Sequence, residues 1–186
     1  MTDDPPSPAA DERDGPPRAV LVAAIVVAAG AVVALLAVMA TKQAEPAPQP
    51  VAIAGAPAPQ ADSDACRALA AALPDELGDY HRVQPVDPVP VGAAAWQAEP
   101  GTDPVILRCG LDRPDEFVAS SPLQVVDDVQ WFRIGGEGRT TWVTVDRPVY
   151  VALTLPDASG PTPIQLITAT IAKSMPATQV DPGPVR

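Results

Sequence analysis

Residues 19–40 read AVLVAAIVVAAGAVVALLAVMA, a run of twenty-two residues without a charged side chain. As a helix with a rise of about 1.5 Å per residue, this run is about 33 Å long, which is enough to cross a hydrocarbon core of about 30 Å. We therefore expect one transmembrane helix over 19–40, with all the residues that follow it on one side of a membrane.

The charges beside this run predict its orientation. Arg13 and Arg18 precede it, and only Lys42 follows it within twenty residues. Because cytoplasmic flanks carry an excess of Lys and Arg, we expect a single-pass cell-membrane protein whose C-terminal part lies outside the cytoplasm. The alternative is a secreted protein cleaved near Ala40, because 38–40 fits a signal peptidase site. The run exceeds the roughly 7–15 apolar residues of a signal core, which favours an uncleaved signal anchor.

Proline-rich segments divide the rest of the chain, which contains 25 Pro. Residues 1–18 are acidic and rich in Pro, so we expect a disordered cytoplasmic tail. Residues 41–63 are predicted to be a Pro/Ala-rich linker, and residues 176–186 a tail. One extracytoplasmic domain over 64–175 remains, which is an ordinary size for a single hydrophobic core.

Two amphipathic helices and several alternating strands are predicted inside this domain. Asp64 is expected to cap a helix that continues to Leu73, and Thr162 to cap a last helix with Pro163 at its first position. The predicted strands are 82–86, 94–98, 105–111, 123–134 with a break near Asp127, 139–145 and 149–155. The strand that ends at residue 134 and the two strands after it, 139–145 and 149–155, are expected to form an antiparallel meander. This pattern predicts a two-layer α+β domain, with an antiparallel sheet of four to five strands and two helices on one face.

Cys66 and Cys109 are the two cysteines of the chain. In an oxidising compartment outside the cytoplasm they would pair as a disulfide. The alternative is two buried thiols that do not meet. Their spacing fits neither a zinc site nor a redox motif.

The charged residues favour some functions over others. A net charge of −11 argues against nucleic acid as a partner. His81 is the only histidine, and no serine lies in a nucleophile elbow. We expect no metal, no cofactor and no catalytic residue. Paired carboxylates of an envelope hydrolase, drawn from the acidic clusters at Asp112 and Asp127, are the least favoured alternative.

The tryptophans support two interpretations. Trp96, Trp131 and Trp142 are expected to pack in the core. Alternatively, they form an aromatic binding surface for a ligand or partner, and Arg108, Arg133 or Arg147 makes a polar contact with that ligand or partner. Our predicted ligand or partner surface is Trp96, Arg108, Trp131, Trp142 and Arg147.

Six segments occur in the order C-x-x-L, A-L-P, W, L-R-C-G, W and R, at residues 66–69, 72–74, 95–96, 104–110, 129–131 and 142–147. As a set they resemble an actinobacterial family of small membrane-anchored or secreted proteins that is catalogued only as a domain of unknown function. The resemblance implies a mycobacterial-type cell-envelope location and a Cys66–Cys109 disulfide. It implies no activity.

These observations predict a non-enzymatic, membrane-anchored domain of the cell envelope. The membrane is contacted through the 19–40 helix, and the expected partner is an envelope protein or a cell-wall component. The alternative is a sensor or carrier of a small ligand or wall fragment, with a pocket lined by Trp and Arg.

Overall fold

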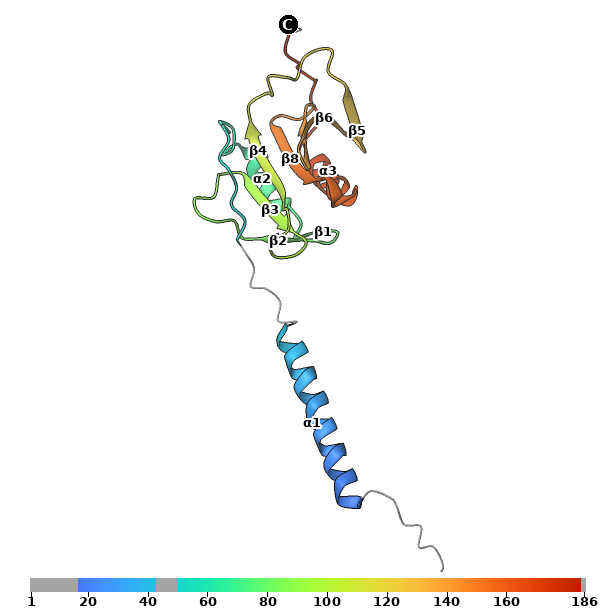
Figure 1. Ribbon diagram of the computed structural model, residues 1–186. Helices are drawn as coiled ribbons and strands as arrows, with labels where there is room; N and C mark the ends of the chain where they lie inside the picture. Colours follow the sequence, from blue (N-terminus) through green and yellow to red (C-terminus); the bar gives the residue numbers. More distant parts are fainter. Residues whose placement is uncertain (1–16, 43–49, 185–186) are drawn as a thin grey trace, which may run out of the picture. The chain divides into compact units, whose positions relative to one another are not determined.

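The computed structural model describes residues 17–42 and 50–184 (Figure 1). The chain divides into two units, Met1–Glu45 and Pro46–Arg186. In the first unit, α1 (Arg18–Lys42) contains a stretch, Arg18–Val38, that is long and apolar enough to cross a membrane. The predicted apolar helix is therefore confirmed, and its length and composition fit a membrane span or a signal sequence. Residues 1–16 of the predicted tail and 43–49 of the predicted linker lie outside the described residues.

The second unit is built on one antiparallel sheet. Its strands are β1 (Glu76–Leu77), β2 (Tyr80–Val83), β3 (Ala93–Gln97), β4 (Val105–Leu111), β5 (Leu123–Val126), β6 (Val129–Gly136), β7 (Arg139–Thr144) and β8 (Tyr150–Pro156). Their order across the sheet is β1-β2-β3-β4-β8-β7-β6-β5. Each half of the unit is thus an antiparallel meander, and the pairing of β4 with β8 joins the two halves at the centre.

The predicted sheet of four to five strands was too small, because the structure has eight strands. The predicted strand over 123–134 is a hairpin, in which β5 and β6 are joined at Asp127 and Asp128. Asp127 has a φ of 47°, a left-handed conformation that Asp tolerates better than most residues. The two-residue strand β1 also extends the other edge. The meander predicted for the last three strands is confirmed.

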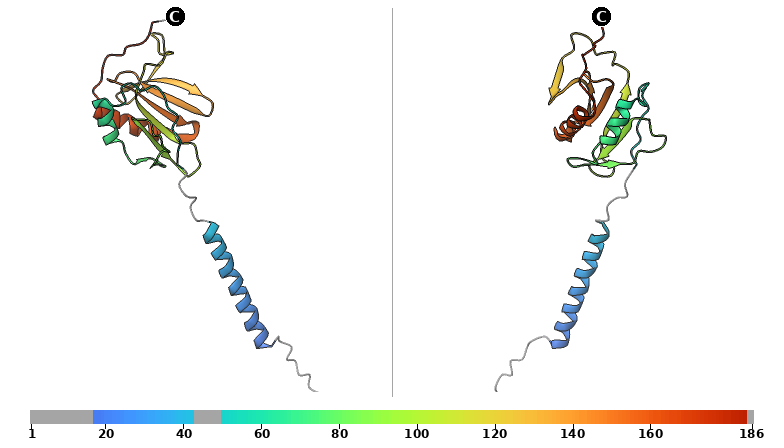
Figure 2. Two further views of the ribbon diagram at one scale, coloured as in Figure 1. Left: turned by 90° about the vertical axis from the view of Figure 1, so that its left-hand side faces the viewer. Right: turned by 180° about the vertical axis from the view of Figure 1, so that it is seen from behind.

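Two helices cover one face of this sheet: α2 (Asp64–Ala72) and α3 (Thr162–Ser174) (Figure 2). Apolar residues of both helices belong to the same core cluster as the inward residues of β3, β4, β6 and β8. The α+β class is therefore confirmed. The short 3₁₀ helix η1 (Asp157–Ser159) precedes α3.

Both helices begin differently from the prediction. Ser63, not Asp64, caps α2, and its hydroxyl accepts a hydrogen bond from the Cys66 backbone N–H at 3.3 Å. The start of α3 is Thr162 itself, preceded by Pro161, and no side chain caps its first turn. Because the Pro161 carbonyl already accepts from the Gln165 N–H at 3.2 Å, Thr162 lies inside the first turn and cannot act as the cap.

Extended segments from both ends of the second unit pack against the sheet. Val51 and Ile53 are 7% exposed and form a second apolar cluster with Ala95 and Ile106. Val180 packs near Phe117 and Phe132 in a third cluster. The packed part of the chain therefore includes residues that were predicted as linker and tail. Their apolar side chains cover strand residues that point away from the helices.

Candidate functional site

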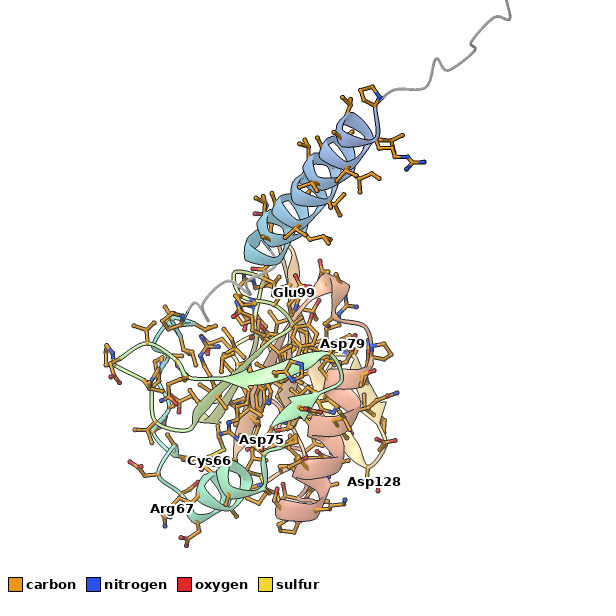
Figure 3. The ribbon with its side chains drawn as sticks, turned by 90° about the horizontal axis from the view of Figure 1, so that it is seen from below. Cys66, Arg67, Asp75, Asp79, Glu99 and Asp128 are labelled. Atoms are coloured by element: carbon orange, nitrogen blue, oxygen red, sulfur yellow. A yellow bond between two sulfur atoms is a disulfide. The ribbon has the colours of Figure 1, made fainter. Side chains whose placement is uncertain are left out.

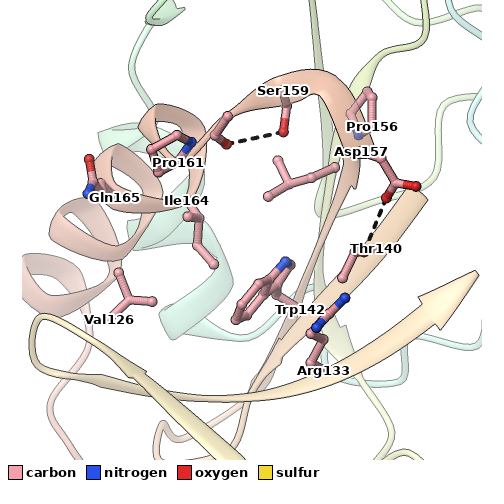
Figure 4. Close-up of a pocket in the computed structure, with 12 residues that line it drawn as sticks. Val126, Arg133, Thr140, Trp142, Pro156, Asp157, Ser159, Pro161, Ile164 and Gln165 are labelled. Carbon is pink, nitrogen blue, oxygen red and sulfur yellow. Dashed lines mark hydrogen bonds between the residues drawn. The ribbon is translucent and has the colours of Figure 1, made fainter. Parts of the chain in front are cut away.

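A cavity of about 600 Å³ opens between the start of α3 and the strands β6 and β7 (Figure 4). Strand residues form one side, and α3 with the loop before it forms the other. Its lining includes Val126 of β5, Arg133 of β6, Thr140 and Trp142 of β7, Leu155 and Pro156 of β8, Asp157, Ser159, Gly160 and Pro161 of the following loop, and Ile164 and Gln165 of α3. The cavity is therefore built between the two layers of the domain.

Strand register places the two most distinctive lining residues side by side. Arg133 and Trp142 are directly opposite each other in the antiparallel pair of β6 and β7. Opposite residues in such a pair project to the same face, with Cβ atoms about 5 Å apart. Trp142 is also opposite Leu153 of β8, which belongs to the helix-facing core. Arg133 and Trp142 therefore both project toward the layer that contains α3.

Trp142 has a mixed environment. Its side chain packs against the main core cluster, yet it stays partly exposed and lines the cavity. Ile164 points into the same space from α3 (Figure 4). An indole that packs partly in the core and is partly exposed offers a rigid apolar surface to a second molecule.

Arg133 supplies the positive charge of the cavity. Its side chain is exposed, and its guanidinium makes no hydrogen bond, ion pair or ring contact with any described residue. The carboxylate of Asp157 also lines the cavity, and it accepts a hydrogen bond from the Thr140 hydroxyl at 3.4 Å. The cavity thus combines apolar walls with one cation that has no partner in the described structure.

Two of the predicted site residues lie in the core. Trp96 and Trp131 are both 0% exposed. The Trp96 indole N–H donates to the Pro74 carbonyl at 2.9 Å, and Arg82 lies 5.6 Å from its ring centre. The structure places both tryptophans where the core-packing interpretation expected them, and neither lines the cavity.

Arg108 and Arg147 lie away from the cavity. Arg108 is on the opposite face of β4, where it donates to the Ala54 carbonyl at 3.1 Å, and burial lowers its pKa below the ordinary value. Arg147 is buried and forms an ion pair with Asp146, with 3.1 Å between Nη1 and Oδ2. The structure therefore brings Trp142 together with Arg133, but not with Arg108 or Arg147.

The sequence pattern did not predict most of the residues that line the cavity. Residues 157–161 consist of the 3₁₀ helix η1 and the two residues after it, and the alternation that places strand residues on one face does not extend into them. Ile164 lies near the start of α3, and Trp142, which lines the same cavity, is more than twenty positions earlier in the chain. Only the packing of α3 against the second meander brings these residues together.

The cavity lining contains several polar side chains besides Arg133. They include no histidine or cysteine, and Ser159 donates its hydroxyl hydrogen bond to the Gly160 carbonyl at 3.3 Å. Among residues 17–42 and 50–184, no group of three or more His, Cys, Asp or Glu is arranged to hold a metal ion. In the described lining, the Thr140 hydroxyl is hydrogen-bonded to the Asp157 carboxylate.

The fold and the cavity define a class: a disulfide-bonded α+β domain that follows a single N-terminal apolar helix. The chain belongs to the family described as Protein of unknown function (DUF3515), whose pattern matches residues 25–180. No curated protein and no solved structure matches the chain.

Proposed function

We propose that this protein is a membrane-anchored binding domain of an actinobacterial cell envelope, which holds a wall component or another small envelope ligand in the Trp142 cavity and catalyses no reaction. One observation carries the proposal: the partly exposed tryptophan lines an open cavity beside an unpaired arginine. The volume of about 600 Å³ lies within the roughly 300–1,000 Å³ of ordinary small-molecule sites.

The proposed location rests on three features. The apolar stretch Arg18–Val38 is long enough to serve as an anchor. The basic residues Arg13 and Arg18 precede it, which favours a cytoplasmic N-terminus. A buried disulfide joins Cys66 and Cys109, and such bonds persist in oxidising compartments outside the cytoplasm.

Reporter fusions test this orientation. We expect alkaline phosphatase to be active when it is fused after Arg186 and inactive when it is fused before Met1 of the full chain. The opposite pattern would place the cavity in the cytoplasm. Immunoblotting of the membrane fraction then shows whether the full-length chain persists or is cut near Ala40.

Photo-crosslinking in intact cells tests binding at the cavity. Gln165 is exposed and lines the cavity, so p-benzoylphenylalanine at this position would face a bound ligand. Lys173 is exposed on the same helix about 12 Å further along its axis, and it is the matched control position. We expect a low-mass adduct at position 165 that is absent at position 173.

Three results would contradict the proposal. Adducts that are equally abundant at both positions, or absent from both, would show that no ligand binds specifically in the cavity. A protein adduct confined to position 165 would assign the cavity to a segment of an envelope protein in place of a small ligand.

A further inference from the structure

We infer that the cavity selects a small organic anion: a flat apolar ring packs on Trp142, and one acidic group on that ring is held by Arg133. This inference rests on the proposed binding role of the cavity and adds the chemical class of the ligand.

The other arginines of the domain all contact partners within the chain. Within residues 50–184, each of the others has a partner: Arg67 with Asp64, Arg82 with the Leu73 carbonyl, Arg108 with the Ala54 carbonyl, Arg113 with Asp181, Arg139 with Asp103, and Arg147 with Asp146. Arg133 is the exception in this described part. A guanidinium left unpaired at the edge of a cavity is available to an acidic group from outside the chain.

The charges around Arg133 also favour an anionic ligand. The protein carries a net charge of −11, so acidic groups are abundant, yet none of those described pairs with Arg133. Asp157 is the one carboxylate in the cavity lining, and it accepts a hydrogen bond from Thr140. The planar guanidinium can donate two parallel hydrogen bonds to a carboxylate, sulfonate or phosphate, which a neutral ligand cannot accept in the same way.

An apolar surface lies beside the Arg133 cation. Leu155 and Ile164 line the cavity next to Trp142. Because Arg133 and Trp142 are directly opposite in the strand pair, a ligand whose acidic group binds the guanidinium has its body over the indole. Stacking of a flat ring on the indole and burial against Ile164 would supply the apolar part of the affinity.

The test compares two probes of nearly the same shape, 2-naphthalenesulfonate and the uncharged 2-naphthalenesulfonamide. The full-length chain is labelled with 5-fluorotryptophan and studied in detergent micelles, where the three tryptophans give three fluorine resonances. A Trp142→Phe variant assigns the cavity resonance, and titrations into empty micelles correct for partitioning. Resonances of the buried Trp96 and Trp131 report whether each variant keeps its fold.

We expect both probes to shift the Trp142 resonance, with the sulfonate binding about fivefold or more tightly than the sulfonamide. Arg133→Gln should reduce this preference below about twofold. Arg133→Lys should retain part of the preference, because a lysine ammonium keeps the positive charge but lacks the two parallel N–H donors of the guanidinium. Arg67→Gln is the matched control. Arg67 lies on the exposed side of α2 (Figure 3), so its replacement should leave the preference unchanged.

The possible failures are distinct. Equal affinities for the two probes, unaffected by Arg133→Gln, would overturn the selection of an anion and leave the cavity as a binding site. A Trp142 resonance that moves with neither probe would overturn the binding role of the cavity as well.

Discussion

Cys66 of α2 and Cys109 of β4 are joined by a disulfide, with their Cα atoms 5.7 Å apart. Both residues are almost fully buried in the main core cluster. The bond therefore ties the first helix of the domain to a central strand, at a sequence separation of 43 residues.

Replacement of Cys66 by Ser should destabilise the oxidised protein. On the chain-entropy model, a closed loop of this length contributes about 4 kcal/mol to the free energy of unfolding. Denaturant unfolding followed by tryptophan fluorescence measures the difference. After reduction of both proteins the difference in stability should nearly vanish. Equal stability of the two oxidised proteins would show that the disulfide does not stabilise the fold.

Gly110 should not tolerate a side chain. Its φ is +85°, and a Cβ at this position would lie 2.2 Å from the Ala61 backbone nitrogen, in the segment that crosses β4. Gly110→Ala combines left-handed strain with a backbone clash, so we expect the free energy of unfolding to fall by about 3 kcal/mol. Equilibrium denaturation measures this loss.

Gly138 is the matched control for Gly110. Its φ is +70°, but a Cβ there would meet nothing within 4 Å. Gly138→Ala should therefore cost about 1 kcal/mol, the backbone strain alone. If both variants lost the same stability, the clash between the new Cβ at Gly110 and Ala61 would contribute nothing to the loss of unfolding free energy.

Arg147 stabilises the turn region through buried contacts. Its side chain is 2% exposed and that of Asp146 is 6% exposed, and its Nη2 donates to the Asp128 carbonyl at 2.7 Å. Arg147→Met would leave the Asp146 carboxylate buried without its cation, so we expect a loss of about 3–5 kcal/mol in thermal or denaturant unfolding.

A double variant separates the ion pair from the packing. Asp146→Asn removes the charge, and its side-chain carbonyl can still accept the hydrogen bond that the Gln130 N–H donates at 3.1 Å. The combination of Asp146→Asn with Arg147→Met should be more stable than Arg147→Met alone. Strictly additive losses would show that the two charges do not depend on each other.

Both tyrosines should titrate at higher pH than an exposed tyrosine. Burial is the main cause that raises the pKa of Tyr80 and of Tyr150 above the ordinary value of 10.0. A pKa raised by folding means that the stability linked to these phenols is present below the ordinary value and is lost as the pH rises through the raised value. Absorbance at 295 nm follows this ionisation, and ionisation of both groups at the ordinary value would contradict the prediction.

The environment of Tyr80 offers a specific check. After burial, the negative charge of Asp79 is the next cause that raises its pKa. Asp79→Asn should therefore move the tyrosine titration to lower pH, while a Tyr80→Phe variant identifies which part of the curve belongs to Tyr80. A titration that Asp79→Asn leaves unchanged would remove Asp79 as a cause and leave burial and the charge of Asp103.

Much of the fold could be predicted from short stretches of sequence. The strand predicted over 105–111 is β4, where alternation puts Val105, Leu107 and Cys109 on one face, and all three belong to the helix-facing core. The sheet was underestimated because a break at Asp127 does not reveal whether the chain bends or reverses. It reverses, and Val126 pairs with Val129 in a hairpin.

The candidate site was much harder to predict. Aromatic character singled out three tryptophans equally, and only packing distinguishes the buried Trp96 and Trp131 from the partly exposed Trp142. In the same way, Arg133 differs from Arg147 only in what surrounds it. Residue type shows which interactions a side chain can make, but exposure depends on every element that packs over it.

The sequence by itself determined the apolar helix near residues 19–40, the helix-and-strand pattern of the domain and the pair of cysteines available for a disulfide. Each depends on residue type and spacing within a short window, where local geometry dominates. The tertiary structure decided the order of the eight strands, the cover of the sheet by the segments near Val51 and Val180, and the cavity where Arg133 and Trp142 face α3. Those features depend on contacts between residues far apart in the chain, which no local pattern specifies.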